Sequence, residues 1–204
     1  ASVPAYHPRL LVGRIRSNNF SRLLSDTLKP LFNRALQAEY PPGSTFKVLN
    51  VLVGLQERAI SLNTYFSCAG PASYPIRCTH DHVSPLGVVS AIRESCNPFL
   101  WNTFKATLYN YETTAEGYNA WYDHVQDFGI GRKLGIDLPN ESKGSLPDEA
   151  YYNRIYGKGH WNALTVRSLA IGQGELGLTP LQLANYSAVI ANRGFYFPPH
   201  VVKT

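Results

Sequence analysis

The sequence pattern predicts a mainly α-helical fold with few strands. Apolar residues recur at helical spacing in several segments, and proline or glycine stands where those segments begin or end. The chain has 204 residues, of which 44% are hydrophobic and 12% are aromatic, so it can bury a sizeable core. Taken alone, the pattern therefore favours an all-α globular protein.

The expected elements of the first half follow in chain order. Residues 1–40 look extended and irregular, and the apolar run after Ser44 predicts a buried central helix over residues 44–59. Two more helices are expected over residues 84–94 and 98–109. The second of these starts at Pro98, because proline suits the first position of a helix.

In the second half, apolar spacing predicts a helix over residues 117–128 that ends at Gly129. Thr179 followed by Pro180 predicts the start of the last helix, which Gly194 closes. The segments expected to be short extended pieces are residues 195–197 and 201–202.

Charge and hydropathy argue against two other classes of protein. The net charge is +5, but the basic residues form dispersed pairs rather than a stripe, so a nucleic-acid partner is not expected. No apolar run reaches the ~18 residues that a membrane helix needs, and the first residues lack the features of a signal peptide.

A candidate nucleophile lies in the run Tyr40-Pro41-Pro42-Gly43-Ser44-Thr45-Phe46-Lys47. Ser44 and Lys47 are three residues apart, so one helical turn would bring the amine toward the hydroxyl. Serine is a poor nucleophile without an adjacent base, and a lysine taken out of water loses its proton more readily. The spacing alone is weak, because most S-x-x-K matches on helices are solvated pairs.

A second motif, Ser95-Cys96-Asn97, strengthens this interpretation. In an extended or turning tripeptide the first and third side chains share one side, so Ser95 and Asn97 can face a cleft while Cys96 points away. S-x-x-K followed by S-x-N is the motif pair of the penicillin-interacting serine enzymes. The chain resembles the class B penicillin-binding proteins, and within them the elongation-type penicillin-binding protein 2 group. Further matching segments, in family order, are Leu31-Phe32-Asn33-Arg34-Ala35, Phe128-Gly129-Ile130-Gly131, Gly135-Ile136-Asp137-Leu138-Pro139 and Ser168-Leu169-Ala170-Ile171-Gly172-Gln173-Gly174.

The resemblance implies an α+β fold of the transpeptidase and serine β-lactamase type, with a five-stranded antiparallel sheet flanked by helices. The 204 residues would supply mainly its helical part and an incomplete sheet. The implied activity is that of a peptidoglycan D,D-transpeptidase, which cross-links stem peptides through an acyl-enzyme on Ser44 and is trapped by β-lactams. Lys47 would be the base, Ser95 a proton relay and Asn97 the group that holds a substrate amide; no organic cofactor is implied.

The third family motif, Lys-Thr/Ser-Gly, is not found in these residues. The chain closes on Lys203-Thr204, but residues 197–202 resemble a family segment that precedes that motif by some distance. We therefore expect residues 1–204 to be a partial transpeptidase domain and a poor catalyst by itself. The resemblance also implies an N-terminal membrane helix outside this sequence, a catalytic domain on the periplasmic side of the inner membrane, and a glycan polymerase as partner.

All three cysteines lie between or within the two motifs, together with two of the six histidines. A zinc site needs about four ligands and commonly uses thiolate and imidazole. The candidate ligands are Cys68, Cys78, Cys96 and His82, with His80 as the alternative to His82. Some members of the penicillin-binding protein 2 group carry a structural zinc in this interval. A Cys68–Cys78 disulfide, or three unrelated thiols, are the other interpretations.

Two other functions share the same motifs. A serine β-lactamase would also have Ser44, Lys47 and Ser95-Cys96-Asn97, but the E-x-x-L-N arrangement of class A enzymes does not occur after Asn97. A penicillin-sensing receptor domain would be acylated without turnover. The segments from Phe128 to Pro139 and from Ser168 to Gly174 favour the synthase, by resemblance only.

Overall fold

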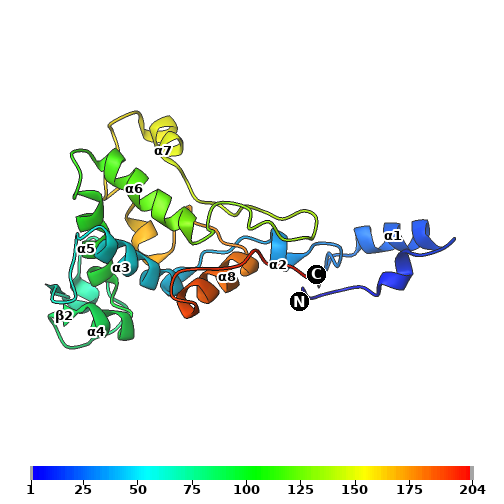
Figure 1. Ribbon diagram of the computed structural model, residues 1–204, viewed down its shortest axis with the longest axis horizontal. Coiled ribbons are helices and arrows are strands. Elements are labelled where there is room, and N and C mark those ends of the chain that lie inside the picture. The colour runs from blue at the N-terminus through cyan, green and yellow to red at the C-terminus, as the bar shows by residue number, and fades with distance from the viewer. Residues whose placement is uncertain (1, 203–204) are drawn as a thin grey trace.

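The computed structural model describes residues 2–202, so Lys203 and Thr204 lie outside the described residues. Figure 1 shows an elongated molecule, with helix α1 (Arg16–Ser25) at one end and the helices around α3 (Lys47–Gln56) at the other. The candidate catalytic motifs belong to this second part. Within the described residues, none of the helices combines the length and apolarity that crossing a membrane requires.

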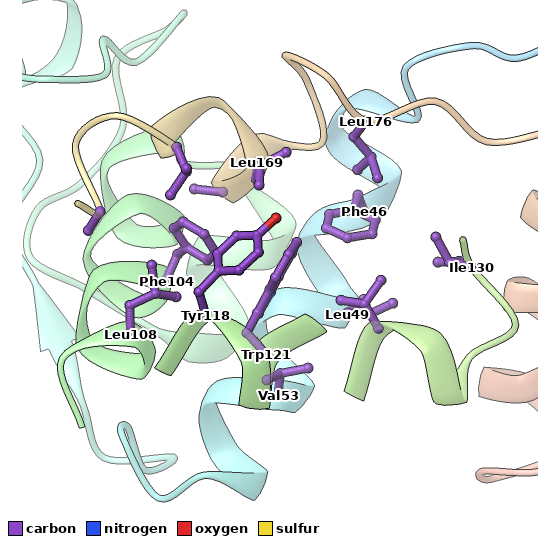
Figure 2. Close-up of a cluster of buried hydrophobic side chains, with 14 of the residues drawn as sticks. Phe46, Leu49, Val53, Phe104, Leu108, Tyr118, Trp121, Ile130, Leu169 and Leu176 are labelled. Atoms are coloured by element: carbon purple, nitrogen blue, oxygen red, sulfur yellow. The ribbon is translucent and has the colours of Figure 1, made fainter. Parts of the chain in front are cut away.

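The core forms around α3, which packs against α5 (Asn97–Leu108) and α6 (Thr114–Asp127). Figure 2 shows Trp121 of α6 between Phe46 and Leu49 on one side and Phe104 and Tyr118 on the other. These side chains are 0–1% exposed. Burying an aromatic or leucine side chain contributes about 1.5–3 kcal/mol, so this cluster fixes the position of α3 and of the motif at its start.

A close approach between α5 and α6 gives the first testable prediction. Gly117 lies on α6, and a Cβ there would stand 2.0 Å from the carbonyl oxygen of Leu108 at the end of α5. Backbone cannot rotate away as a side chain can, so Gly117→Ala should lower the free energy of unfolding by about 1–3 kcal/mol. Urea denaturation measures this. Asp123→Ala on the exposed face of the same helix should change it by less than ~0.5 kcal/mol, and equal stability of the two variants would contradict the packing argument.

A second, smaller core supports the other catalytic motif. Strands β1 (Tyr65–Phe66) and β2 (Leu86–Gly87) pair antiparallel, with Tyr65 opposite Gly87 and Phe66 opposite Leu86. The short helix η3 (Gly70–Ala72) follows β1, and helix α4 (Val88–Arg93) follows β2. The buried residues of this smaller core come from α3, α4, α5, β2 and the loops between them. They are Val51, Ile60, Cys78, Leu86, Val88, Ala91, Cys96, Phe99 and Leu100.

The C-terminal part returns to the central helix. Helix η4 (Arg167–Ile171) packs on α3 and α5, and α8 (Pro180–Ala191) begins with the capping box of Thr179 and Gln182. Single antiparallel bridges join Tyr40 to Leu178 and Ser145 to Gly177. The start of α8 at Pro180, after the Thr179 N-cap, agrees with the sequence prediction.

The structure corrects several predicted elements. Residues 1–40 are not simply irregular, since they contain η1 (Pro8–Leu11), α1 and α2 (Arg34–Gln37). Helix α1 buries only Leu23, so it lacks the apolar stripe by which a helix is found in a sequence. The central helix is shorter than expected, because its first turn is the 3₁₀ helix η2 (Gly43–Phe46) and it ends at Gln56.

Other boundaries also differ. Helix α7 (Glu149–Tyr156) was not expected, although Asp148 caps it by accepting a hydrogen bond from the Tyr151 N–H and Gly157 ends it. Strands β1 and β2 were also missed, because two residues each are too short to show alternation. Within residues 2–202, segments 195–197 and 201–202 form no strand.

Candidate active site

Ser44 lies exposed on the 3₁₀ turn η2, directly before α3. Gly43 starts the turn with φ +58°, a left-handed conformation that glycine adopts without strain. Two long-range hydrogen bonds hold the turn: the Gly43 N–H donates to the Gly172 carbonyl at 2.8 Å, and the Tyr186 hydroxyl donates to the Thr45 carbonyl at 3.1 Å. The backbone around Ser44 is therefore fixed while its hydroxyl faces solvent.

Lys47 is the first residue of α3 and is only 3% exposed. Its Nζ lies 2.8 Å from Ser95 Oγ, 2.5 Å from Asn97 Oδ1 and 2.7 Å from the Ser95 carbonyl oxygen. Burial lowers the pKa of Lys47 below its usual value, although the negative charge that Cys78 and Cys96 carry when ionised opposes this. The amine therefore loses its proton more readily than that of an exposed lysine.

The hydrogen-bond partners of Lys47 match the three donors of an ammonium group. An ammonium group has three N–H donors for the three oxygens, whereas a neutral amine has two donors and one lone pair. In the structure Nζ donates to the Ser95 carbonyl, to Ser95 Oγ and to Asn97 Oδ1, so loss of a proton from Lys47 would leave one of these three oxygens without its donor. The side-chain contacts of Lys47 join it to the Ser95 motif, and its recorded hydrogen bonds do not include Ser44 Oγ.

Ser95 and Asn97 project toward Lys47 while Cys96 is fully buried on the other side, as the tripeptide pattern predicts. Ser95 has φ +50°, a left-handed conformation that costs a residue other than glycine about 1–3 kcal/mol and is common at functional sites. Asn97 donates one N–H to the Arg77 carbonyl at 2.9 Å, and its second N–H has no acceptor among the described residues.

The cysteines and one histidine converge directly behind this motif. One ligand atom from each of Cys68, Cys78, His82 and Cys96 lies within 4.8 Å of all the others, and all three cysteines are free thiols. A tetrahedral zinc with bonds of about 2.0–2.3 Å keeps its ligands roughly 3.8 Å apart or closer, so a small contraction would bring these four into range. Backbone N–H groups of Asn97 and His80 lower the pKa of Cys78 to about 7 against the effect of burial, which favours its thiolate, whereas burial raises the pKa of Cys96 to about 12, so Cys96 would lose its proton only on binding a metal.

The choice between the two candidate histidines follows from their partners. His82 Nε2 lies 3.4 Å from Cys78 Sγ, and its Nδ1 lies 3.1 Å from the Val83 carbonyl oxygen. A proton on Nδ1 that bonds to this carbonyl leaves Nε2 free to bind a metal, the usual arrangement of a ligand histidine. His80 Nε2 instead lies 2.5 Å from the Glu94 carbonyl oxygen. The cluster of candidate metal ligands therefore consists of Cys68, Cys78, His82 and Cys96, and it does not include His80.

Comparison with known proteins agrees with this geometry. The family model described as the penicillin binding protein transpeptidase domain matches residues 1–204. The chain belongs to this family. Among curated relatives, the peptidoglycan D,D-transpeptidase MrdA of Acinetobacter baumannii is 34% identical over 208 residues, covering 99% of this chain and 30% of the relative. MrdA of Escherichia coli K12 is 30% identical over 210 residues, covering 100% of this chain and 31% of the relative.

Solved structures of the family share the fold. Pseudomonas aeruginosa PBP2, in complex with WCK 5153, superposes with a TM-score of 0.82 at 28% identity, covering 100% of this chain and 46% of that one. The complex of Helicobacter pylori PBP2 with MreC contains a match with a TM-score of 0.77 at 28% identity, covering 98% of this chain and 36% of that one. The transpeptidase fold of the resemblance is thereby confirmed, with a two-stranded sheet among residues 2–202. The chain spans about 30% of the length of the curated relatives named above.

Sequence reasoning missed Asn50 and Tyr186, whose long-range contacts lie around the turn that carries Ser44, and it included Gly172 only as part of a family segment. All three act over long sequence separations, so no local motif reveals these contacts. Asn50 did leave one signal, since it is the only polar side chain in the apolar run from Val48 to Leu55. A polar residue at a core position needs buried partners, and this predicts a hydrogen-bonded role.

Proposed function

We propose that residues 1–204 form part of the transpeptidase domain of a peptidoglycan D,D-transpeptidase that acts through an acyl-enzyme on Ser44. The observation that carries this proposal is the position of the Lys47 amine, 2.8 Å from Ser95 Oγ and 2.5 Å from Asn97 Oδ1, one turn from Ser44. Membership of the family and the activity named for its MrdA relatives support the same function.

In the proposed acylation, Ser44 Oγ attacks the carbonyl of the penultimate D-alanine of a stem peptide. Lys47 accepts the proton of Ser44 as the new C–O bond forms, because a neutral, desolvated amine is an effective base. Ser95, which contacts Lys47, passes a proton to the leaving nitrogen of the terminal D-alanine as the C–N bond breaks. Asn97 holds a backbone carbonyl of the donor peptide through its second N–H.

An amine of a neighbouring stem peptide then attacks the acyl-enzyme, which forms the cross-link and returns Ser44 to its free state. A β-lactam resembles the D-alanyl-D-alanine end and leaves a stable acyl group on Ser44. The parent protein is proposed to be anchored in the inner membrane, with this domain on the periplasmic side. The complex of Helicobacter pylori PBP2 with MreC, and the peptidoglycan synthase complex that coordinates polymerization with crosslinking, support MreC-like and glycan polymerase partners.

A structural zinc is part of the proposal. Cys68, Cys78, His82 and Cys96 offer three thiolates and one imidazole, the donor set of a closed zinc site. Four protein ligands leave no position for water, so the metal would supply rigidity rather than chemistry. Because Cys96 stands between Ser95 and Asn97, it would tie the backbone of that motif to the metal.

Fluorescent penicillin tests the nucleophile. The full-length protein should be labelled covalently, and Ser44→Ala should remove the label completely because Ser44 is the proposed nucleophile, whereas the Ser95 hydroxyl beside Lys47 is proposed to relay a proton. Ser187→Ala, on the exposed side of α8, serves as the control and should be labelled as the parent protein is. Label that persists on a folded Ser44→Ala protein would refute the assignment of Ser44.

A further inference from the structure

Asn50 is a polar residue inside the apolar helix α3. It lies on α3, one turn after Lys47, and is 1% exposed. Its Nδ2 donates to the carbonyls of Leu169 at 3.1 Å and Ala170 at 2.9 Å, and its Oδ1 accepts from Trp121 Nε1 at 2.7 Å. Both amide hydrogens and the amide oxygen are therefore used, which is what a buried amide requires.

The two carbonyls that Asn50 holds belong to helix η4. The residue after this helix, Gly172, contacts the turn that carries Ser44. Gly172 follows this helix in the left-handed conformation, with φ +69°, and its carbonyl accepts the Gly43 N–H at 2.8 Å. A Cβ on Gly172 would stand 2.3 Å from the Gly43 carbonyl oxygen, so the two backbones are in close contact. A displacement of the end of η4 would therefore move Gly43, the residue before Ser44.

A second connection runs through Trp121. The indole that donates to Asn50 packs edge-on against Phe46, with ring centroids 6.3 Å apart, and against Phe104 at 5.2 Å. Phe46 belongs to the same 3₁₀ turn as Ser44. Figure 2 shows Trp121 and Phe46 side by side in the core. Asn50 thus touches both supports of the turn, the η4 backbone and the indole, without touching Ser44 itself.

We propose that Asn50 is a positioning residue for the nucleophile, and that its amide fixes the backbone placement of Ser44 through Leu169, Ala170 and Gly172. The inference rests on the proposed function, because it concerns the same acylation step. A misplacement of a reacting group by about 1 Å can slow a reaction about 100-fold. A buried amide that does not touch Ser44 can therefore still affect the acylation rate.

The test replaces the amide by a carboxyl of the same shape. Asn50→Asp keeps an acceptor for Trp121 and removes the N–H groups that hold η4. In the full-length protein, stopped-flow acylation by a β-lactam gives the first-order rate constant at saturation and the half-saturating concentration separately. The expected result is a rate constant about 10- to 100-fold lower with an unchanged half-saturating concentration, because the bound β-lactam is held but Ser44 is displaced.

Gln182→Glu is the matched control. Gln182 is also a buried amide, with 1% of its surface exposed. Its Nε2, however, donates to the carbonyls of Gly129, Arg132 and Lys143. The same chemical change at this site should lower the melting temperature and leave the first-order acylation rate constant within about twofold. A merely structural role of Asn50 would make the two variants alike.

An unchanged first-order rate constant in folded Asn50→Asp, or an equal loss in Gln182→Glu, would overturn the proposal. If Asn50→Asp does not fold, Asn50→Ser takes its place, since a neutral and shorter side chain cannot reach both carbonyls. Failure of the proposed function is a separate outcome: the parent protein itself would then show no acylation, whereas failure of this inference leaves the parent acylated at its normal rate.

Discussion

Replacing Lys47 by alanine is expected to slow acylation of the full-length protein by about 10²–10⁴-fold, the usual contribution of a general base. The physical reason is that Ser44 then has no group to accept its proton, while Ser95 and Asn97 lose the amine that joins them. Labelling with a fluorescent penicillin over time measures the rate.

Lys47→Arg separates the base from the positive charge. Arginine keeps charge and hydrogen-bond donors but does not lose its proton in proteins, so it should be nearly as inactive as alanine. Lys105→Ala serves as the control, since Lys105 is exposed on α5 and should leave the rate unchanged. A Lys47→Arg protein that is acylated at the parental rate would contradict the role of Lys47 as base.

The pH dependence follows from the same group. Only the neutral amine accepts a proton, so the acylation rate should rise with pH and level off above the pKa of Lys47. Because burial lowers this pKa, the increase in acylation rate should occur at a lower pH than it would for an exposed lysine. The rise should disappear in Lys47→Ala, which distinguishes this titration from that of any other group.

The candidate catalytic residues could be proposed from the sequence because the two motifs that contain them are local. Ser44 and Lys47 are three residues apart and Ser95 and Asn97 share one tripeptide, so each pair could be found by its spacing, whereas the contact of Lys47 with Ser95 and Asn97 joins residues about 50 positions apart. The strained backbone of Ser95, with φ +50°, could not be predicted in the same way, because serine carries no preference for that conformation.

The supports of the nucleophile could not be predicted, because they join residues far apart in the chain. Asn50 and Ala170 are separated by 120 positions, and Tyr186 and Thr45 by 141. Helix α1 was missed for the opposite reason, since it buries a single leucine and its pattern resembles that of a loop. Local patterns therefore revealed the groups proposed to react, while long-range packing decides where they are held.

The metal ligands stand between these two cases. The sequence shows three cysteines and two histidines in one interval, but it left His80 and His82 as alternative ligands. The structure brings His82 to the thiols and directs His80 to the Glu94 carbonyl. A tetrahedral donor set could be expected from the sequence, but the choice of imidazole depends on the path of the loop between Cys78 and Ser84.

Removal of the proposed zinc is expected to have the largest effect on stability. Protein purified without chelator under reducing conditions should contain about one zinc per chain by elemental analysis. Stripping it should lower the free energy of unfolding by about 4 kcal/mol, if zinc had been present at about a thousand times its dissociation constant. Acylation should slow as well, because Cys96 lies between Ser95 and Asn97 and is packed in the same small core as Cys78.

The two neighbouring histidines provide the matched comparison. His82→Gln removes the imidazole that points at Cys78 and should lower the zinc content well below one per chain. His80→Gln alters a histidine that lies two residues away and outside the cluster, and it should leave the zinc content unchanged. Well-folded protein without zinc, or equal zinc loss in both variants, would refute a metal site built from Cys68, Cys78, His82 and Cys96. If only His82→Gln loses zinc and is acylated more slowly, then the metal acts on catalysis through the backbone of the Ser95 motif, because its four protein ligands leave no position for substrate.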